Sequence, residues 1–273
     1  MSFWGRVNKT YAYGKIFNYK RSLEEIYFWL IGDKRISQKT FFKKISSKNK
    51  NFLPKSKTNK NSLKKIELAK KELSWVLKFP LICFIGITGS VSANNAKKND
   101  DIDIFIITTP HSLWLARPIF LLYLEIRGLR RKRSTPYSKQ SDLICTNLWM
   151  DVLNLSVQKK DRNLYTAHEV LLVLPIVNKN DTYQKFLVSN SWVKKYLANA
   201  YSIISSKKRF KETNSNFWFL LSPFNLFMYL VQRILMFPVS KGERVSYFQA
   251  FFHDQNYSKK VLSEHNKDKS NYN

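Results

Sequence analysis

Residues 86–103 combine small residues with a closely spaced pair of acids. Gly86-Ile-Thr-Gly-Ser90 ends a run of branched apolar residues, and Asp101-Ile-Asp103 begins after ten further residues. Two acids separated by one residue on a strand point to the same face, with Cα atoms about 6.5 to 7 Å apart. Carboxylates this close repel each other unless a cation neutralises them, and their oxygens suit Mg²⁺. The spacing therefore predicts a site for one or two divalent cations.

The same residues predict contact with phosphate groups. The Gly89-Ser90 turn offers backbone amides and a hydroxyl with little side-chain bulk, so we expect it to hold the β- and γ-phosphates of a nucleoside triphosphate. Lys97 or Lys98 in the following loop would add positive charge. Mg²⁺ on Asp101 and Asp103 would lower the pKa of an attacking hydroxyl and neutralise a pyrophosphate leaving group. The chemistry indicated is phosphoryl transfer.

Hydrophobic spacing identifies the elements that must position these residues. Branched apolar runs predict buried strands at 81–88, 101–109 and 143–150. Helical spacing predicts helices at 63–77, at 113–129 and over much of 165–200. The order helix, strand, strand, helix, strand is typical of an α/β or α+β core.

The N-terminal part is basic and predicts two short helices. Ser22 and Glu25 form a capping-box pattern, and Ser37 can cap a second helix, so residues 23–46 have helix-turn-helix spacing. From Lys39 to Lys78 there are thirteen Lys and two Glu, with a polar, aperiodic middle. This favours a mobile loop or the wing of a winged helix that contacts nucleic acid; the alternative is a two-helix packing element with a solvated linker.

Residues 217–239 form the most apolar segment. It is long enough to span a bilayer, but Pro223, Asn225, Gln232, Arg233 and Pro238 interrupt it. A central Arg alone costs about 2.5 to 3.5 kcal/mol on insertion, so we predict a buried helix rather than a span. Peripheral contact with anionic lipid is the alternative, because basic residues at 207–209, 211 and 241 flank the segment. The last fifteen residues are polar and are expected to fray.

The composition predicts a folded cytoplasmic protein with an anionic partner. Basic residues outnumber acidic ones by 47 to 19 among 273 residues, a net charge of +28, which favours nucleic acid, an acidic membrane surface or nucleotide phosphates. Compositional bias toward Lys would produce the same excess. Cys83 and Cys145 lie in apolar runs and indicate no disulfide framework. The first residues lack the apolar region of a signal peptide.

Gly89, Ser90, Asp101 and Asp103 resemble the signature of the DNA polymerase beta-like nucleotidyltransferase superfamily. The segments ITGSVSANNAKKNDDIDIFIIT, DLICTNLWMD, RNLYTAHEV, TYQKFLVSNSWVKKYL and AFFHD also resemble bacterial proteins with a nucleotidyltransferase domain over most of the chain. The resemblance implies an α+β fold, with a mixed sheet flanked by helices as the core (61–160). A helix-turn-helix-like region (1–60) and a helical C-terminal region (161–273) would surround it. It also implies Mg²⁺-dependent transfer of a nucleoside monophosphate from a nucleoside triphosphate to an unassigned hydroxyl, with Asp101 and Asp103 as metal ligands.

The superfamily carries a third carboxylate on a later strand, which is expected to help deprotonate the acceptor. In the strand at 143–150 the candidate inward position holds Thr146 or Asn147, neither of which is an acid. Asp151, after the strand, is our candidate for this catalytic carboxylate, and Asp142, before it, is the alternative. If neither serves, the site lacks this ligand and is slow or inactive. The rival function is then a degenerate scaffold that binds nucleic acid or a membrane surface.

Other polar residues carry weaker signals. His168-Glu169 would place a base near the site, although a structural role is the commoner reading of such a pair. Arg127, Arg130, Arg131 and Arg133 form an Arg cluster that would complement a helix C-terminus or contact phosphates. The remaining His residues show no zinc-ligand spacing with Cys.

Overall fold

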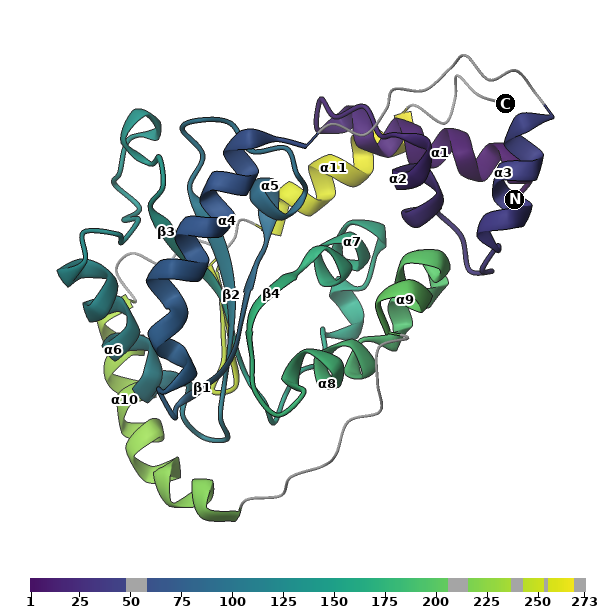
Figure 1. Cartoon of the computed structure of the whole chain (residues 1–273). Coiled ribbons are helices and arrows are strands. Elements are labelled where there is room, and N and C mark those ends of the chain that lie inside the picture. Colours follow the sequence, from purple (N-terminus) through teal and green to yellow (C-terminus); the bar gives the residue numbers. More distant parts are fainter. Residues whose placement is uncertain (48–57, 206–215, 237–242, 253–254, 268–273) are drawn as a thin grey trace.

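A mixed six-stranded sheet forms the centre of the computed structural model, which describes residues 1–47, 58–205, 216–236, 243–252 and 255–267 (Figure 1). The strands follow the order β4-β1-β2-β3-β6-β5. Their bounds are β1 Ile82–Ile87, β2 Ile102–Thr108, β3 Ile144–Asp151, β4 Leu174–Asn178, β5 Arg244–Val245 and β6 Gln249–Phe251. β2 and β3 are parallel, and every other neighbouring pair is antiparallel. The sheet is open, and the predicted mixed α+β fold is confirmed at this level.

Helices cover both faces of the sheet. One face packs against α4 (Lys60–Leu73), α6 (Leu113–Ile126) and α10 (Ser222–Met236), around buried residues such as Ile104, Trp114 and Phe120. The other face packs against α7 (Leu164–Leu172), α8 (Thr182–Ser189) and α9 (Ala198–Ser205), around residues such as Phe84 and Phe105. Figure 1 shows these two layers on opposite sides of the strands. β2 therefore lies in the middle of the protein, with a core on each face.

The N-terminal helices pack against the C-terminal ones. They are α1 (Phe3–Ile16), α2 (Leu23–Phe28) and α3 (Gln38–Ser46). α2 begins with the predicted capping box of Ser22 and Glu25, and α3 is capped by Ser37. The buried Asn199 of α9 donates to the carbonyl of Tyr27 and accepts from the Ile36 amide. α1 lies against α11 (Gln255–Lys267). Most of the predicted basic loop, residues 48–57, lies outside the described residues.

The predicted strands and most predicted helices are present, but five elements differ from the prediction. β4 interrupts the region predicted as helical between residues 165 and 200. Pro175 lies in β4 and has no amide hydrogen to donate. It is tolerated because β4 is an edge strand, which pairs only with β1 and has no second neighbouring strand to hydrogen-bond. α1, the β5-β6 pair and α11 were not predicted, and α11 occupies much of the C-terminal stretch expected to fray.

The prediction of a buried helix over residues 217–239 is wrong, because α10 exposes much of its apolar surface. Phe224, Phe227 and Ile234 are 66%, 63% and 73% exposed. The stretch Trp218–Met236 is long and apolar enough, by length and composition alone, to cross a membrane.

Lys65 of α4 ties together the two loops that precede β2 and β3. Its side chain is 2% exposed, and its Nζ lies 2.8 Å from Asp142 Oδ1 and 2.7 Å from the carbonyl oxygen of Asp100. The neighbouring Lys64 is 77% exposed and only 3.9 Å from the same carboxylate. A buried cation thus fixes the backbone next to Asp101, the first acid of the pair.

We predict that Lys65→Met destabilises the protein by about 2–3 kcal/mol, because it removes the buried cation that pairs with the Asp142 carboxylate and the Asp100 carbonyl oxygen. Lys64→Met is the matched control and should change stability by less than about 0.5 kcal/mol. Chemical denaturation of both variants measures the difference. Equal stabilities would show that Lys65 does not fasten these loops.

Candidate active site

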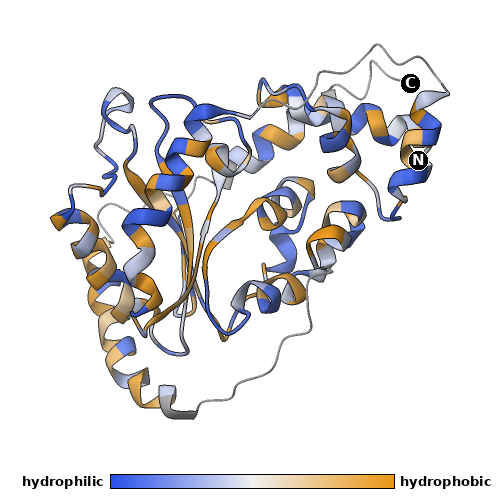
Figure 2. Ribbon diagram, viewed as in Figure 1, coloured by the Kyte–Doolittle hydropathy of each residue, from blue (hydrophilic) through white to orange (hydrophobic). Residues whose placement is uncertain are grey.

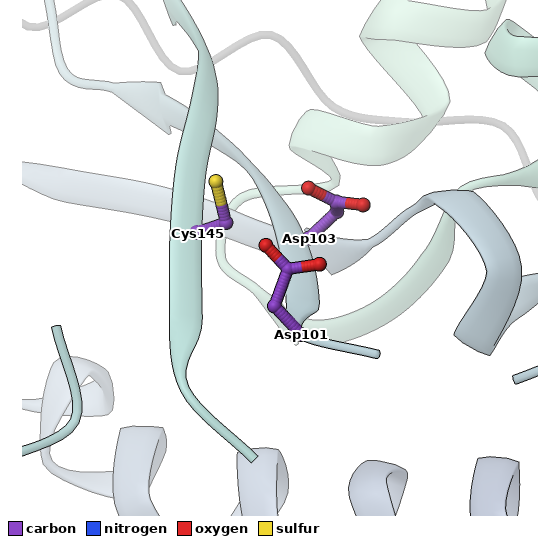
Figure 3. A group of neighbouring side chains, drawn as sticks. All are labelled: Asp101, Asp103 and Cys145. Carbon is purple, nitrogen blue, oxygen red and sulfur yellow. The ribbon is translucent and has the colours of Figure 1, made fainter. Parts of the chain in front are cut away.

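Asp101 and Asp103 lie side by side at the start of β2. Asp101 directly precedes the strand and Asp103 lies within it, paired with Cys145 of β3. One ligand atom from each of these three residues lies within 4.8 Å of the other two, and Figure 3 shows the three side chains gathered at one point. The two carboxylates are partly buried and the thiol is buried. This cluster can hold a metal ion, and the predicted orientation of the Asp pair is present.

Two neighbouring groups partly compensate the charges of the pair. Arg131 Nε lies 3.2 Å from Asp101 Oδ2, and Asn147 Nδ2 donates to Asp103 Oδ1 over 2.7 Å. Burial nevertheless raises the pKa of Asp101, although the Arg131 charge opposes this. Burial and the Asp101 carboxylate together raise the pKa of Asp103 to about 7. The Arg131 charge opposes this shift at Asp103 but does not cancel it, and a divalent cation would supply the positive charge needed to keep the carboxylate ionised.

The Gly89-Ser90 turn lies directly against Asp103. The Thr88 amide donates to the Asp103 carbonyl over 2.9 Å, and Gly89 has a φ of +63°. A Cβ atom on Gly89 would lie 2.7 Å from Asp103 Oδ2, so no larger residue fits at this position without moving the carboxylate. Ser90 Oγ donates to Asp100 Oδ2 over 2.9 Å. The structure thus brings together four of the sequence-predicted residues: Gly89, Ser90, Asp101 and Asp103.

These residues open into a cavity of about 520 Å³. Its walls come from the Gly-Ser turn, from the Asp pair, from α1 and α2, and from α7. The lining includes Tyr13, Tyr19, Arg21, Glu25, Trp29, Thr88, Gly89, Ser90, Asn94, Asn95, Asp101, Asp103, Tyr165, His168, Glu169 and Tyr257. The N-terminal helices are therefore part of the wall of this cavity. A chamber of this size accommodates a nucleotide-sized ligand.

Two candidates for the third carboxylate lie away from the pair. Asp151 is at the opposite end of β3, paired with Thr108, and is fully buried, where it accepts from the Ser112 and Leu153 amides. The six residue steps from Cys145 to Asp151 along β3 span roughly 20 Å. Asp142 is held by Lys65. Neither carboxylate lines the cavity, so the assignment of a catalytic role to Asp151 is not supported by its position.

The predicted lysines also lie outside the cavity. The side chains of Lys97 and Lys98 are exposed, and neither is among the residues that line it. Their backbones serve the loop instead: the Lys97 amide donates to Asp100 Oδ2, and the Lys98 carbonyl accepts from Lys65.

Cys145 and Asn147 face the pair from β3, the strand on which the resemblance places a third acid. The Cys145 thiol donates to Asn147 Oδ1 over 2.9 Å. Burial and the two carboxylates raise the pKa of this thiol, so it stays protonated and is a poor ligand for a hard cation such as Mg²⁺. The oxygen ligands available to a cation here are the two Asp carboxylates, because Asn147 turns its amide nitrogen toward Asp103 and its amide oxygen accepts from Cys145. This donor set fits Mg²⁺, which commonly takes one or two carboxylates and completes its shell with water or substrate phosphate.

α7 contributes a third carboxylate from across the cavity. Glu169 lines the cavity, and burial followed by the Asp103 charge raises its pKa to about 7. Its neighbour His168 is 4% exposed and stacks on Tyr13 at a centroid distance of 4.1 Å. The His168 Nε2 atom has no hydrogen-bond partner among the described residues. The sequence predicted that the His168-Glu169 pair could place a base near the site. It gave no signal that α7 packs next to the start of β2 and so brings Glu169 into the cavity.

Comparison of the chain with family models, with curated proteins and with solved structures found no match. What can be said of the site therefore comes from its own residues and their geometry.

The raised pKa of Asp103 predicts a pH-dependent stability in metal-free protein. Because the folded-state pKa of about 7 exceeds the unfolded value of about 3.9, the contribution of Asp103 to stability is complete below about pH 4. It is then lost as the pH rises through about 7. Asp103→Asn removes this loss, so the variant should be more stable than wild type by about 1–2 kcal/mol at about pH 8 and equal to it near pH 4.

Thermal unfolding at several pH values in a chelating buffer measures this difference. Added Mg²⁺ should stabilise wild type but not the variant. A variant that is less stable than wild type at about pH 8 without metal would contradict the assigned electrostatics.

Proposed function

We propose that this protein is a magnesium-dependent nucleotidyltransferase that moves a nucleoside monophosphate from a nucleoside triphosphate to a hydroxyl group. The observation that carries the proposal is the direct packing of Gly89 against Asp103, because it places a small-residue turn and a carboxylate pair in one cavity. The resemblance of these same residues to the polymerase beta-like signature supports it. The specific nucleotidyltransferase fold and the implied mechanism are part of the proposal.

Asp101 and Asp103 would hold one or two Mg²⁺ ions. Bound there, Mg²⁺ would lower the pKa of the attacking hydroxyl and offset charge on the leaving pyrophosphate. Gly89 and Ser90 would approach the phosphates through their backbone, since Gly89 leaves no side chain in the way, whereas the Thr88 amide is already bonded to the Asp103 carbonyl.

Glu169 would accept the proton of the acceptor hydroxyl. Its pKa of about 7 matches a base that works near neutral pH, and it faces the same cavity as the Asp pair. This role replaces the one expected of Asp151, which is sealed at the other end of β3. His168 stays neutral, because burial and the nearby Arg21 charge lower its pKa well below the usual value.

The aromatic and cationic wall from the N-terminal region would contact the base or the acceptor. Arg21 is buried, lies over the rings of Tyr13 and Trp29 at 5.4 Å and 5.7 Å, and lines the cavity with them. The Tyr13 ring is already stacked on His168, so the Trp29 ring and the Arg21 guanidinium are the groups of this wall that suit a planar or anionic ligand.

The proposal predicts that Asp101→Asn and Asp103→Asn each abolish Mg²⁺-dependent nucleotide binding, because either change removes a metal ligand. Transfer from α-labelled ATP, CTP, GTP or UTP to an acceptor in cell extract should fall at least 100-fold in both variants. Glu169→Gln should keep nucleotide binding but lower transfer by roughly 10²- to 10⁴-fold. Glu24→Gln, which changes an exposed acid of α2, is the matched control and should leave both unchanged.

Isothermal titration with Mg²⁺ and each nucleotide, together with the transfer assay, tests this. If the two Asp variants bind nucleotide as tightly as wild type, the enzyme proposal is wrong, and the core serves as a scaffold.

We predict that the substitution Asn147→Asp increases the affinity for Mg²⁺. Asn147 already lies 2.7 Å from Asp103, so an acid there would supply the third carboxylate with little change in shape. We expect Mg²⁺ affinity to rise by about tenfold or more, and metal-free stability to fall because like charges then crowd the site. Titration of Mg²⁺ against wild type and variant measures this, with Asn154→Asp, an exposed residue beyond the far end of β3 from the Asp pair, as control. Weaker Mg²⁺ binding by Asn147→Asp would place the cation elsewhere.

A further inference from the structure

α10 has its polar residues turned inward. Asn225 Oδ1 accepts from the amide of Trp114 over 2.8 Å, at the start of α6. Gln232 Nε2 donates to the Trp114 carbonyl over 2.7 Å, and its Oε1 accepts from Arg117. Asn225 is fully buried and Gln232 is 7% exposed. Two amide side chains on one face of α10 therefore fasten it to α6.

The opposite face of α10 and the turn before it is apolar and points to solvent. We call this the apolar face; it consists of Phe219, Phe224, Phe227, Leu230, Ile234 and Leu235, each more than half exposed. Asn225 and Gln232 lie about 20° apart around the helix, whereas Phe227, Leu230 and Ile234 lie on the far side of its axis. Figure 2 shows the hydrophobic colouring along α10. α6, which packs against α10, exposes Ile119, Leu122 and Ile126 as well.

This arrangement is the reverse of a surface helix in water, which buries its apolar face and exposes its polar one. Contiguous exposed apolar surface of this kind marks a surface that another body covers. The amide hydrogen bonds to α6 oppose a simple rotation that would bury the apolar residues, because turning the helix would break them.

We propose that the apolar face docks in the plane of an anionic lipid surface. The charge of the protein selects this occupant. The stretch Trp218–Met236 contains no acidic residue, its one charged residue is the exposed Arg233, and the whole chain carries +28. An anionic bilayer attracts such a protein, whereas a second copy brings a charge of the same sign against it. An apolar helix face with cations nearby is the form that lies along the lipid headgroups.

The orientation of α10 excludes a crossing in this folded state. A span would take Asn225, Gln232 and Arg233 into hydrocarbon and would separate the two amides from Trp114 and Arg117. Docking along the surface keeps those bonds. α10 covers one face of the sheet, and the helix α7 that lines the cavity covers the other, so docking leaves the cavity on the side away from the lipid.

Vesicle flotation tests this proposal independently of any transferase activity. The full chain is mixed with vesicles of phosphatidylcholine containing about 30% phosphatidylserine, and in parallel with vesicles of phosphatidylcholine alone. We expect wild type to float with the anionic vesicles and less with the neutral ones, and high salt to weaken the binding. The double variant Phe227→Ser/Ile234→Ser should lose at least about tenfold in partitioning, because two exposed apolar side chains no longer enter the lipid.

The control is Leu153→Ser/Val188→Ser, which removes two side chains that are 53% and 52% exposed elsewhere on the surface. It should float like wild type. Circular dichroism of both variants checks that they fold, and sedimentation velocity without lipid gives the oligomeric state. Wild type that stays at the bottom of the gradient overturns the proposal. So does a wild-type dimer that Phe227→Ser/Ile234→Ser dissociates, because a second copy would then cover the apolar face.

Discussion

Two carboxylates held against each other at the edge of a buried strand are the constraint around which this protein is organised. Asp101 and Asp103 project to one side of β2, and β2 lies between two hydrophobic cores that leave the strand little freedom to move. Arg131 compensates one carboxylate, and Asn147 gives the other only a neutral donor. Burial raises the pKa of both carboxylates, and the Asp101 charge adds to this shift at Asp103, so ionisation of the pair is disfavoured until a cation neutralises it. A divalent cation would relieve this unfavourable ionisation, which is the physical reason that the cluster can hold a metal ion.

The surrounding elements serve this pair in different ways. Lys65 of α4 fixes the loops that lead into β2 and β3, and Gly89 lets the turn after β1 approach the Asp103 carboxylate. α7 closes the cavity with Glu169 from the other side, and α1 and α2 complete its wall. The N-terminal region, which its basic composition alone would assign to nucleic-acid binding, is therefore structurally continuous with the cavity. On the far face of the sheet, α10 has an independent role as an exposed apolar surface.

The sequence predicted the local parts of this arrangement well and the long-range parts poorly. The strand run after Asp101, the capping box at Ser22 and the turn at Gly89 are set by neighbouring residues, and all three are present in the structure. The pairing of Asp103 with Cys145 is set by the parallel register of β2 and β3, which no local pattern encodes. For the same reason the sequence favoured Asp151 as the third acid, although it lies at the opposite end of β3 from the Asp pair. The sequence singled out Glu169 as a candidate base, but it could not predict that α7 brings this residue into the wall of the cavity. Apolar composition predicted burial for α10, but the inward-facing Asn225 and Gln232 reverse that outcome.

The most direct test of the central claim is a crystal structure of the protein grown with Mn²⁺ and a non-hydrolysable nucleoside triphosphate, with data collected for anomalous scattering from manganese. Mn²⁺ takes the same oxygen ligands as Mg²⁺ and can be located without ambiguity. The account predicts an anomalous peak within bonding distance of carboxylate oxygens of both Asp101 and Asp103, with the triphosphate against the Gly89-Ser90 turn. A triphosphate bound elsewhere, or a pair of carboxylates without manganese beside a bound nucleotide, would contradict it.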